Sequence, residues 1–145
     1  MRTYAERYHD ISVGHRVAGH ESKCQHLHGH NYRVSFSIEA QALDKVGRVI
    51  DFSVIKMVLC EWLEENWDHK FLLWEKDPIL EEEKTRDVFL NKVTGVVLVP
   101  FNPTAENMAA YILTTVAPAL LQELNVELVS VVIEETRKCQ VKCSL

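Results

Sequence analysis

The segment from residue 15 to residue 30, HRVAGHESKCQHLHGH, is the part of the chain richest in residues able to do chemistry. It holds five histidines and one cysteine within 16 residues. His28 and His30 flank Gly29, and alternate residues of an extended backbone project to the same side, so both imidazoles can reach one ion. Neutral imidazole suits zinc, and three histidines leave a fourth position for water or substrate. We expect His15, which ends a candidate strand, to be the third ligand.

The same segment leaves alternatives open. Spacing alone does not separate His26 from the ligand set, although we expect His20 and His26 to be loop residues. Cys24 either serves as an acid/base group beside the metal or completes a closed tetrahedral site, which would be structural. A polar loop with scattered surface histidines is the simplest alternative. His28 and His30, two residues apart and preceded by another histidine and a cysteine, argue against this alternative.

Two further clusters contain titratable groups. Asp68 precedes His69, and a carboxylate can orient an imidazole and stabilise its charged form, although adjacent residues need not bond to each other. Glu134 and Glu135 end a valine-rich segment, and on a strand one of the two faces inward. A buried carboxylate there needs a hydrogen-bond donor, which a ligand can supply. A solvated helix end and strand-end charges in water are the plain alternatives.

Composition narrows the class of protein. The chain has 145 residues, of which 47% are hydrophobic and 26% charged, and this predicts one globular domain over residues 1–145. The net charge of −5 argues against nucleic-acid binding, which relies on a basic surface. No apolar run approaches the roughly 18 residues of a membrane span. The first ten residues lack the apolar core of a secretory signal, so we expect a cytoplasmic protein with four reduced cysteines.

Periodicity predicts the elements that position these groups. Residues 31–40 alternate as a strand, and residues 5–14 are a plausible partner. Asp51 caps a helix over 52–66, whereas the charged stretch 75–92 is expected to be a solvated loop with at most one helical turn. The rest is predicted to be a strand at 96–99, a helix from Thr104 that Pro118 kinks or ends, and strands at 127–135 and 139–144. This order favours an α+β fold with an antiparallel sheet packed against helices.

Six short motifs, in one order from position 15 to position 136, resemble the 6-pyruvoyltetrahydropterin synthase family. The resemblance is strongest to its 6-carboxytetrahydropterin synthase branch, because only three residues separate Cys24 from the HGH motif. The sequence departs from the family's pattern in two places. The segment 75–95 is longer and more charged than expected, and Ile11 stands where the family usually has an aromatic residue, four positions before His15. The matching motifs are His15-Arg16, Cys24-x3-His28-Gly29-His30-Asn31-Tyr32, Val49-Ile50-Asp51-Phe52, Asp68-His69, Pro103-Thr104-Ala105-Glu106-Asn107 and Glu135-Thr136.

The resemblance implies a role for each matching residue. Zinc would be held by His15, His28 and His30, with Cys24 as the catalytic thiol and Asp68 and His69 as a proton-handling pair. Glu135 would anchor the pterin ring by accepting hydrogen bonds from its N–H groups. Thr104 and Glu106 are assigned mainly to the start of a helix, with a role near the pterin as the second reading. Basic candidates for a triphosphate site are Arg16, Lys23, Lys70 and Arg137.

The resemblance also implies a substrate and an assembly. The substrate would be 7,8-dihydroneopterin triphosphate, and the products 6-carboxy-5,6,7,8-tetrahydropterin, acetaldehyde and triphosphate, on the route to queuosine. The nearest alternative is a pyruvoyl synthase with the same metal, and an alternative of another class is a non-catalytic zinc or pterin-binding protein. The implied fold is the tunnelling fold, with two helices on one face of the sheet. It forms a barrel, expected here to be a homohexamer with active sites between subunits.

Overall fold

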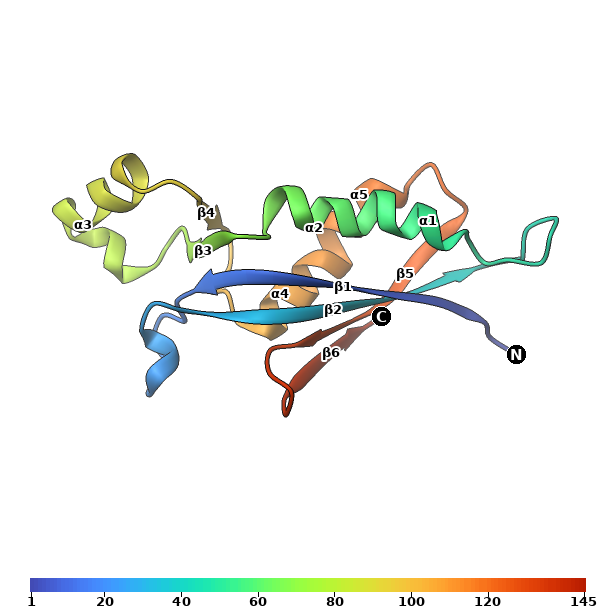
Figure 1. Cartoon of the computed structure of the whole chain (residues 1–145), viewed down its shortest axis with the longest axis horizontal. Coiled ribbons are helices and arrows are strands. Elements are labelled where there is room, and N and C mark those ends of the chain that lie inside the picture. Colours follow the sequence, from blue (N-terminus) through green and yellow to red (C-terminus); the bar gives the residue numbers. More distant parts are fainter.

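The computed structural model describes residues 1–145 and contains one curled sheet of six strands (Figure 1). The strand order is β4-β3-β1-β2-β5-β6. The neighbours β1 and β2, β2 and β5, and β5 and β6 are antiparallel, whereas β3 runs parallel to both β1 and β4. The strand bounds are β1 Tyr4–His15, β2 His28–Ala40, β3 Lys70–Trp74, β4 Val96–Val99, β5 Val126–Glu134 and β6 Gln140–Ser144.

The long β1–β2 hairpin decides which residues face the core. Ile11 and Val13 on β1 and Tyr32 and Val34 on β2 are all buried, while the residues between them are more exposed. Because side chains alternate along a strand, every second residue from these positions to the ends of both strands also faces the core. His15 pairs with His28 across the hairpin and therefore projects to the same face.

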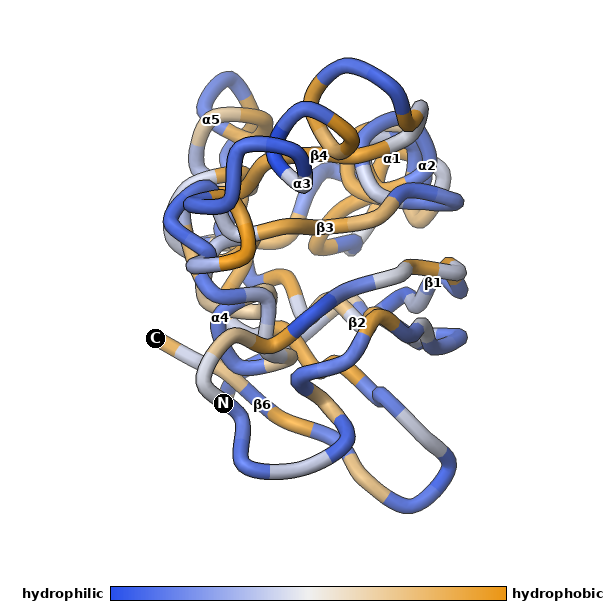
Figure 2. Tube along the Cα trace, turned by 90° about the vertical axis from the view of Figure 1, so that its left-hand side faces the viewer, coloured by the Kyte–Doolittle hydropathy of each residue, from blue (hydrophilic) through white to orange (hydrophobic).

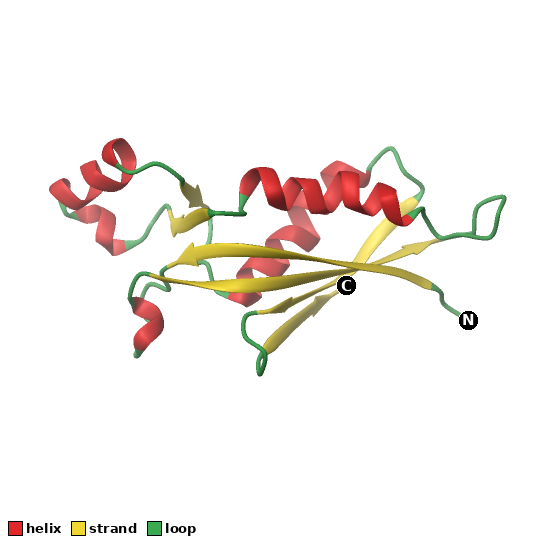
Figure 3. Ribbon diagram, in the orientation of Figure 1, coloured by secondary structure: helices red, strands yellow, loops and turns green.

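Two long helical segments cover this face of the sheet (Figure 3). The first consists of α1 Phe52–Ile55, a π turn Lys56–Cys60 and α2 Glu61–Asn66, and Asp51 caps it by accepting a hydrogen bond from the Ser53 N–H. The second consists of α4 Ala105–Tyr111, a π turn Ile112–Val116 and α5 Ala117–Leu121. The first packs against β1 and the second against β5 and β6. The α+β class and the two covering helices are as predicted.

The strand β3 was not predicted, and it makes the sheet mixed rather than wholly antiparallel. It follows directly after His69 and is too short for its hydrophobic pattern to mark it as a strand rather than part of a helix end. Leu72 and Leu73, on successive positions, are both fully buried, so the strand lacks the alternation of a half-exposed strand. Figure 2 shows β3 as largely hydrophobic beside the hydrophilic segment around α3.

The prediction of a solvated loop over 75–92 is wrong. This segment forms a 3-10 turn Pro78–Glu81, the helix α3 Glu83–Asp87 and a π turn Val88–Lys92. Glu82 begins the helix because its carboxylate accepts hydrogen bonds from the Lys84 and Thr85 N–H groups. The acidic residues that suggested a loop thus act at the start of a helix.

Of the two predicted effects of Pro118, a kink or an end of the helix, the end is wrong, because the helical segment continues to Leu121. The π turn just before the proline changes the bonding pattern, and the Ala117 N–H donates to the Ile112 carbonyl. Pro118 then occupies the first turn of α5, where a missing N–H is tolerated. None of the helices is long and apolar enough to cross a membrane.

Candidate metal centre and active site

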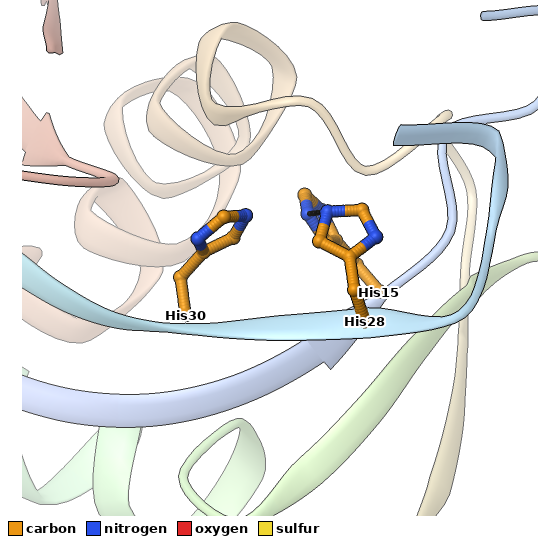
Figure 4. A group of neighbouring side chains, drawn as sticks. All are labelled: His15, His28 and His30. Atoms are coloured by element: carbon orange, nitrogen blue, oxygen red, sulfur yellow. Dashed lines mark hydrogen bonds between the residues drawn. The ribbon is translucent and has the colours of Figure 1, made fainter. Parts of the chain in front are cut away.

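Three histidines meet where β1 ends and β2 begins (Figure 4). His15 comes from β1, and His28 and His30 come from β2. One nitrogen of each ring lies within 4.8 Å of the corresponding nitrogens of the other two. The Nε2 atoms of His15 and His28 are 3.0 Å apart. Strand register alone therefore brings together the three residues that the sequence predicted as ligands.

Hydrogen bonds to the backbone fix the tautomers of two of these rings. The His15 Nδ1 lies 2.6 Å from the Pro103 carbonyl oxygen, and the His28 Nδ1 lies 2.7 Å from the His26 carbonyl oxygen. A carbonyl only accepts, so each Nδ1 carries the hydrogen and each Nε2 presents a lone pair. Two lone pairs so close repel each other unless a cation or a proton lies between them. Metal-binding histidines commonly have this second hydrogen bond.

The environment of His15 and His30 disfavours protonation of their rings. Burial lowers the pKa of His15 to about 4, and burial also lowers the pKa of His30. The His30 Nε2 is buried without a hydrogen-bond partner, and the nearby Glu135 Oε1 lies 3.2 Å away without hydrogen-bonding geometry. Neutral rings and an unpartnered buried nitrogen are what a zinc ion requires of its ligands. The residues present fit the predicted metal.

Tyr32 completes the environment of the cluster, whereas the sequence placed it only in the strand over 31–40 and in the motif that holds His28 and His30. Its hydroxyl oxygen is 3.2 Å from each ring nitrogen of His15. Burial is the largest of the effects that raise the pKa of Tyr32, followed by the charges of Glu135 and Cys24, so the phenol keeps its proton. The sequence did contain an indication of this contact, because Tyr32 lies two residues after His30 and so projects from the same face of the strand.

Cys24 lies in the β1–β2 connection, within a 3-10 turn of Lys23–Gln25. It is a partly buried free thiol in the connection between the two strands that carry the histidines. Its sulfur is not part of the group of converging ligand atoms, and neither is a ring nitrogen of His20 or His26. This arrangement favours an open site of three histidines over a closed one.

Asp68 and His69 form a hydrogen-bonded pair on the turn between α2 and β3. Asp68 Oδ2 lies 2.8 Å from His69 Nδ1, and Asp68 Oδ1 accepts from the Ser12 N–H at 2.8 Å. Burial acts to raise the pKa of Asp68, but the Ser12 N–H and His69 together hold it below its ordinary value. His69 has a φ of 58° and an imidazole that is 79% exposed. The pair is thus preorganised and open to solvent.

The Asp68–His69 pair lies on the other face of the sheet from the three histidines. His69 lines a surface pocket with Ser12, Gly14 and Asn31, and intervening residues of both strands, including His30, line it as well. Ser12 and Asn31 are neighbours across the hairpin, one residue out of phase with the core-facing Val13 and His30. Side chains one residue apart project to opposite faces. Within one chain, the His69 imidazole therefore lies on the opposite face of the sheet from the three histidine rings.

Three predicted substrate residues have distinct positions. The Glu135 carboxylate lies beside the cluster, with Oε1 3.5 Å from the His15 Nε2. Thr104 caps α4, and its hydroxyl accepts from the Asn107 N–H at 3.1 Å, as its assignment to a helix start predicted. Glu106 is exposed in the first turn of the same helix. Arg16, a candidate for the triphosphate, instead pairs with Asp77.

The curled sheet and the histidine cluster together define a tunnelling-fold protein with a candidate metal centre. The family model described as 6-pyruvoyl tetrahydropterin synthase matches residues 4–144, and the chain belongs to this family.

Relatives and solved structures agree with this assignment. The chain is 36% identical to a 6-carboxy-5,6,7,8-tetrahydropterin synthase of Rickettsia typhi, over 92% of this chain and 94% of that protein. It is 37% identical to a probable enzyme of the same name from Halobacterium salinarum, over 87% of this chain and 76% of that protein.

Two solved structures share the fold. An uncharacterized protein from Wolinella succinogenes has a TM-score of 0.82 at 23% identity, covering 99% of this chain and 98% of that one. The 6-pyruvoyl tetrahydropterin synthase of Caenorhabditis elegans has a TM-score of 0.63 at 21% identity, covering 100% and 96%.

Proposed function

We propose that the protein is a zinc-dependent 6-carboxy-5,6,7,8-tetrahydropterin synthase. It would convert 7,8-dihydroneopterin triphosphate to 6-carboxy-5,6,7,8-tetrahydropterin, acetaldehyde and triphosphate, a step in queuosine precursor synthesis. The observation that carries the proposal is the convergence of three imidazoles, one with a buried and unpartnered nitrogen, with a free thiol in the connection between their two strands. Relatives at 33–37% identity, over most of the chain, carry this enzyme name.

His15, His28 and His30 would hold the zinc ion. When bound, zinc supplies Lewis-acid chemistry, which stabilises negative charge on substrate oxygens and lowers the pKa of a hydroxyl. The protein contributes a fixed set of ligands, because two of the rings are oriented by the Pro103 and His26 carbonyls. Cys24 lies outside the ligand group and so remains free to act on the substrate.

The thiolate of Cys24 would remove a proton from the substrate side chain. His69 would return or relay protons, with Asp68 orienting its ring through the Nδ1 hydrogen bond and stabilising its charged form. Glu135 would anchor the pterin by accepting hydrogen bonds from its N–H groups. Its carboxylate is only 29% exposed and lies at the edge of the histidine cluster, so the ring would be held close to the metal.

Assembly would bring His69 into the site. Because Asp68 and His69 lie on the opposite face of the sheet from the three histidines, we infer that a neighbouring subunit supplies them. Closed rings of identical subunits place one face of each chain against the next and so allow such shared sites. A cytoplasmic homohexamer built as a barrel is the proposed assembly.

A product assay on the zinc-loaded protein tests the proposal. With 7,8-dihydroneopterin triphosphate as substrate, we expect acetaldehyde and a carboxypterin in equal amounts. A pyruvoyl pterin without acetaldehyde would instead identify a pyruvoyl synthase. Tight zinc binding with no turnover would identify a non-catalytic metal protein.

A further inference from the structure

A buried ion pair joins the charged segment after β3 to the start of the β1–β2 connection. The Arg16 Nε donates to the Asp77 Oδ2 at 3.0 Å. The Asp77 side chain is 0% exposed and that of Arg16 is 20% exposed. Asp77 also caps the turn Pro78–Glu81, because its Oδ1 accepts from the Ile79 N–H at 2.9 Å. Both carboxylate oxygens are therefore engaged, and the carboxylate is fixed in position.

The same arginine reaches the turn that carries Cys24. The Arg16 Nη1 donates to the Gln25 carbonyl, directly after Cys24 in the chain. The Cys24 carbonyl accepts from the Val17 N–H at 2.8 Å. Consecutive carbonyls on the Cys24 turn are thus bonded to consecutive residues at the end of β1. A continuous series of hydrogen bonds runs from the Ile79 N–H through Asp77 and Arg16 to Gln25.

Packing does not hold the Cys24 turn in place. The turn Lys23–Gln25 contains no buried residue, and its preceding residue Ser22 makes no side-chain cap. A polar turn with few apolar contacts is held chiefly by its hydrogen bonds, and it moves when they are lost. Arg16 is therefore placed to decide where the thiol lies relative to the histidines.

We propose that Asp77 is a positioning residue for Cys24 and acts through Arg16. This inference rests on the proposed role of Cys24 as the reacting thiol. It also gives a function to the segment 75–95, whose charge and length depart from the pattern of the family. Asp77 fixes one arm of the guanidinium, and the planar fork then directs the other arm at the Gln25 carbonyl. A lysine would pair with Asp77 as a point charge but could not hold both partners in one plane.

The test compares Arg16→Lys and Asp77→Asn with a matched control, Asp44→Asn. Asp44 also pairs with an arginine, at 2.9 Å from Arg48, and also accepts backbone N–H bonds, but it lies in the turn before α1. Alkylation of Cys24 by iodoacetamide is followed against pH by peptide mass spectrometry, which separates it from the other three cysteines. Zinc content, thermal melting, kcat and KM are measured on the same samples.

We expect both test variants to bind zinc as the wild type does, with an altered pH profile of Cys24 alkylation and a kcat lowered about tenfold or more at a smaller change in KM. Asp44→Asn should leave the Cys24 alkylation profile, zinc content, kcat and KM unchanged. Arg16→Lys keeps a cation beside Asp77, so it decides the question if Asp77→Asn unfolds. An unchanged Cys24 profile in folded, zinc-loaded Arg16→Lys would overturn the inference. Turnover retained in Cys24→Ala would instead refute the role of the thiol, while the alkylation profile would still test its positioning.

Discussion

The histidine cluster and the Asp68–His69 pair are built in opposite ways. His15, His28 and His30 project from paired strands, on the core-facing side of a long hairpin, and backbone carbonyls hold the rings of His15 and His28. Asp68 and His69 lie on the turn before β3, with the His69 imidazole exposed and its backbone in the left-handed region. Strand register fixes the positions of the three histidines within one chain. The Ser12 N–H fixes Asp68 by a hydrogen bond, but the Asp68–His69 pair lies on the other face of the sheet.

The difference shows that one chain brings the three histidines together but places the Asp68–His69 pair on the other face of the sheet. Ligands on rigid elements hold a metal in a fixed geometry, and the two strands of the hairpin are such elements. A group that faces another subunit can be exposed and strained within its own chain, because its partners arrive on assembly. Mutations in the two regions should therefore separate metal binding from proton handling.

The largest expected effect follows replacement of a ligand. His28→Ala should weaken zinc binding by more than about a hundredfold, since loss of an outer hydrogen-bond partner alone costs about ten- to a hundredfold. Activity should be lost with the metal.

Cys24→Ala should also abolish turnover but retain zinc, as measured by metal analysis after dialysis. Loss of zinc from Cys24→Ala would show that the thiol is a fourth ligand.

Removal of the His69 imidazole should affect only catalysis. We expect His69→Ala to lower kcat by about a hundredfold or more, the usual contribution of a general acid or base. Zinc content should equal that of the wild type, because His69 lies on the other face of the sheet. Steady-state kinetics with metal analysis measures both. A His69→Ala protein that lost its zinc would contradict the separation of the two regions.

Gly29, between the two ligands of β2, should tolerate no side chain. A Cβ there would lie 3.0 Å from the Val13 carbonyl oxygen and 3.4 Å from the Gly14 Cα, and backbone atoms cannot move aside as a side chain can. Gly29→Ala should lower the free energy of unfolding by about 1–2 kcal/mol and weaken zinc binding, because the strands must separate where His15 faces His28. Denaturant unfolding measures the first effect. Ser35→Ala, farther along β2, is the control and should change neither property.

The smallest expected effect concerns the backbone of His69. Its φ of 58° is unfavourable for a residue with a Cβ and readily adopted by glycine. His69→Gly and His69→Ala both remove the imidazole, so the difference between them isolates the strain. We expect the glycine variant to be more stable by up to about 1 kcal/mol in chemical denaturation. A glycine variant less stable than the alanine variant would show that the turn carries no strain.

The sequence predicted what depends on local periodicity. The spacing of His28 and His30 placed both on one strand face, and the expectation of a paired strand before them correctly added His15. The strand β4 was predicted at its observed bounds, because its short β-branched run is framed by turn residues. The caps Asp51 and Thr104 also began helices as expected.

The rest depended on tertiary contacts that no local pattern records. The charged stretch after β3 was interpreted as a loop. Asp77 in that stretch is buried because it pairs with Arg16, which is far away in the sequence, and no local pattern indicates this contact. The location of His69 on the other sheet face follows from the placement of β3 beside β1, a strand that the sequence did not reveal. Tyr32 was assigned only to a strand, because its contact with His15 depends on the register of the hairpin.

Mixing two inactive variants tests most directly the claim that the metal centre and the proton pair come from different chains. Cys24→Ala and His69→Ala proteins, co-expressed or refolded together, should regain up to about one quarter of wild-type activity, because random assembly of a closed oligomer then pairs an intact Cys24 with an intact His69 at that frequency. Each variant alone should remain inactive. If mixed assemblies form but show no activity above that of the separate variants, one chain supplies both groups and the shared site is refuted.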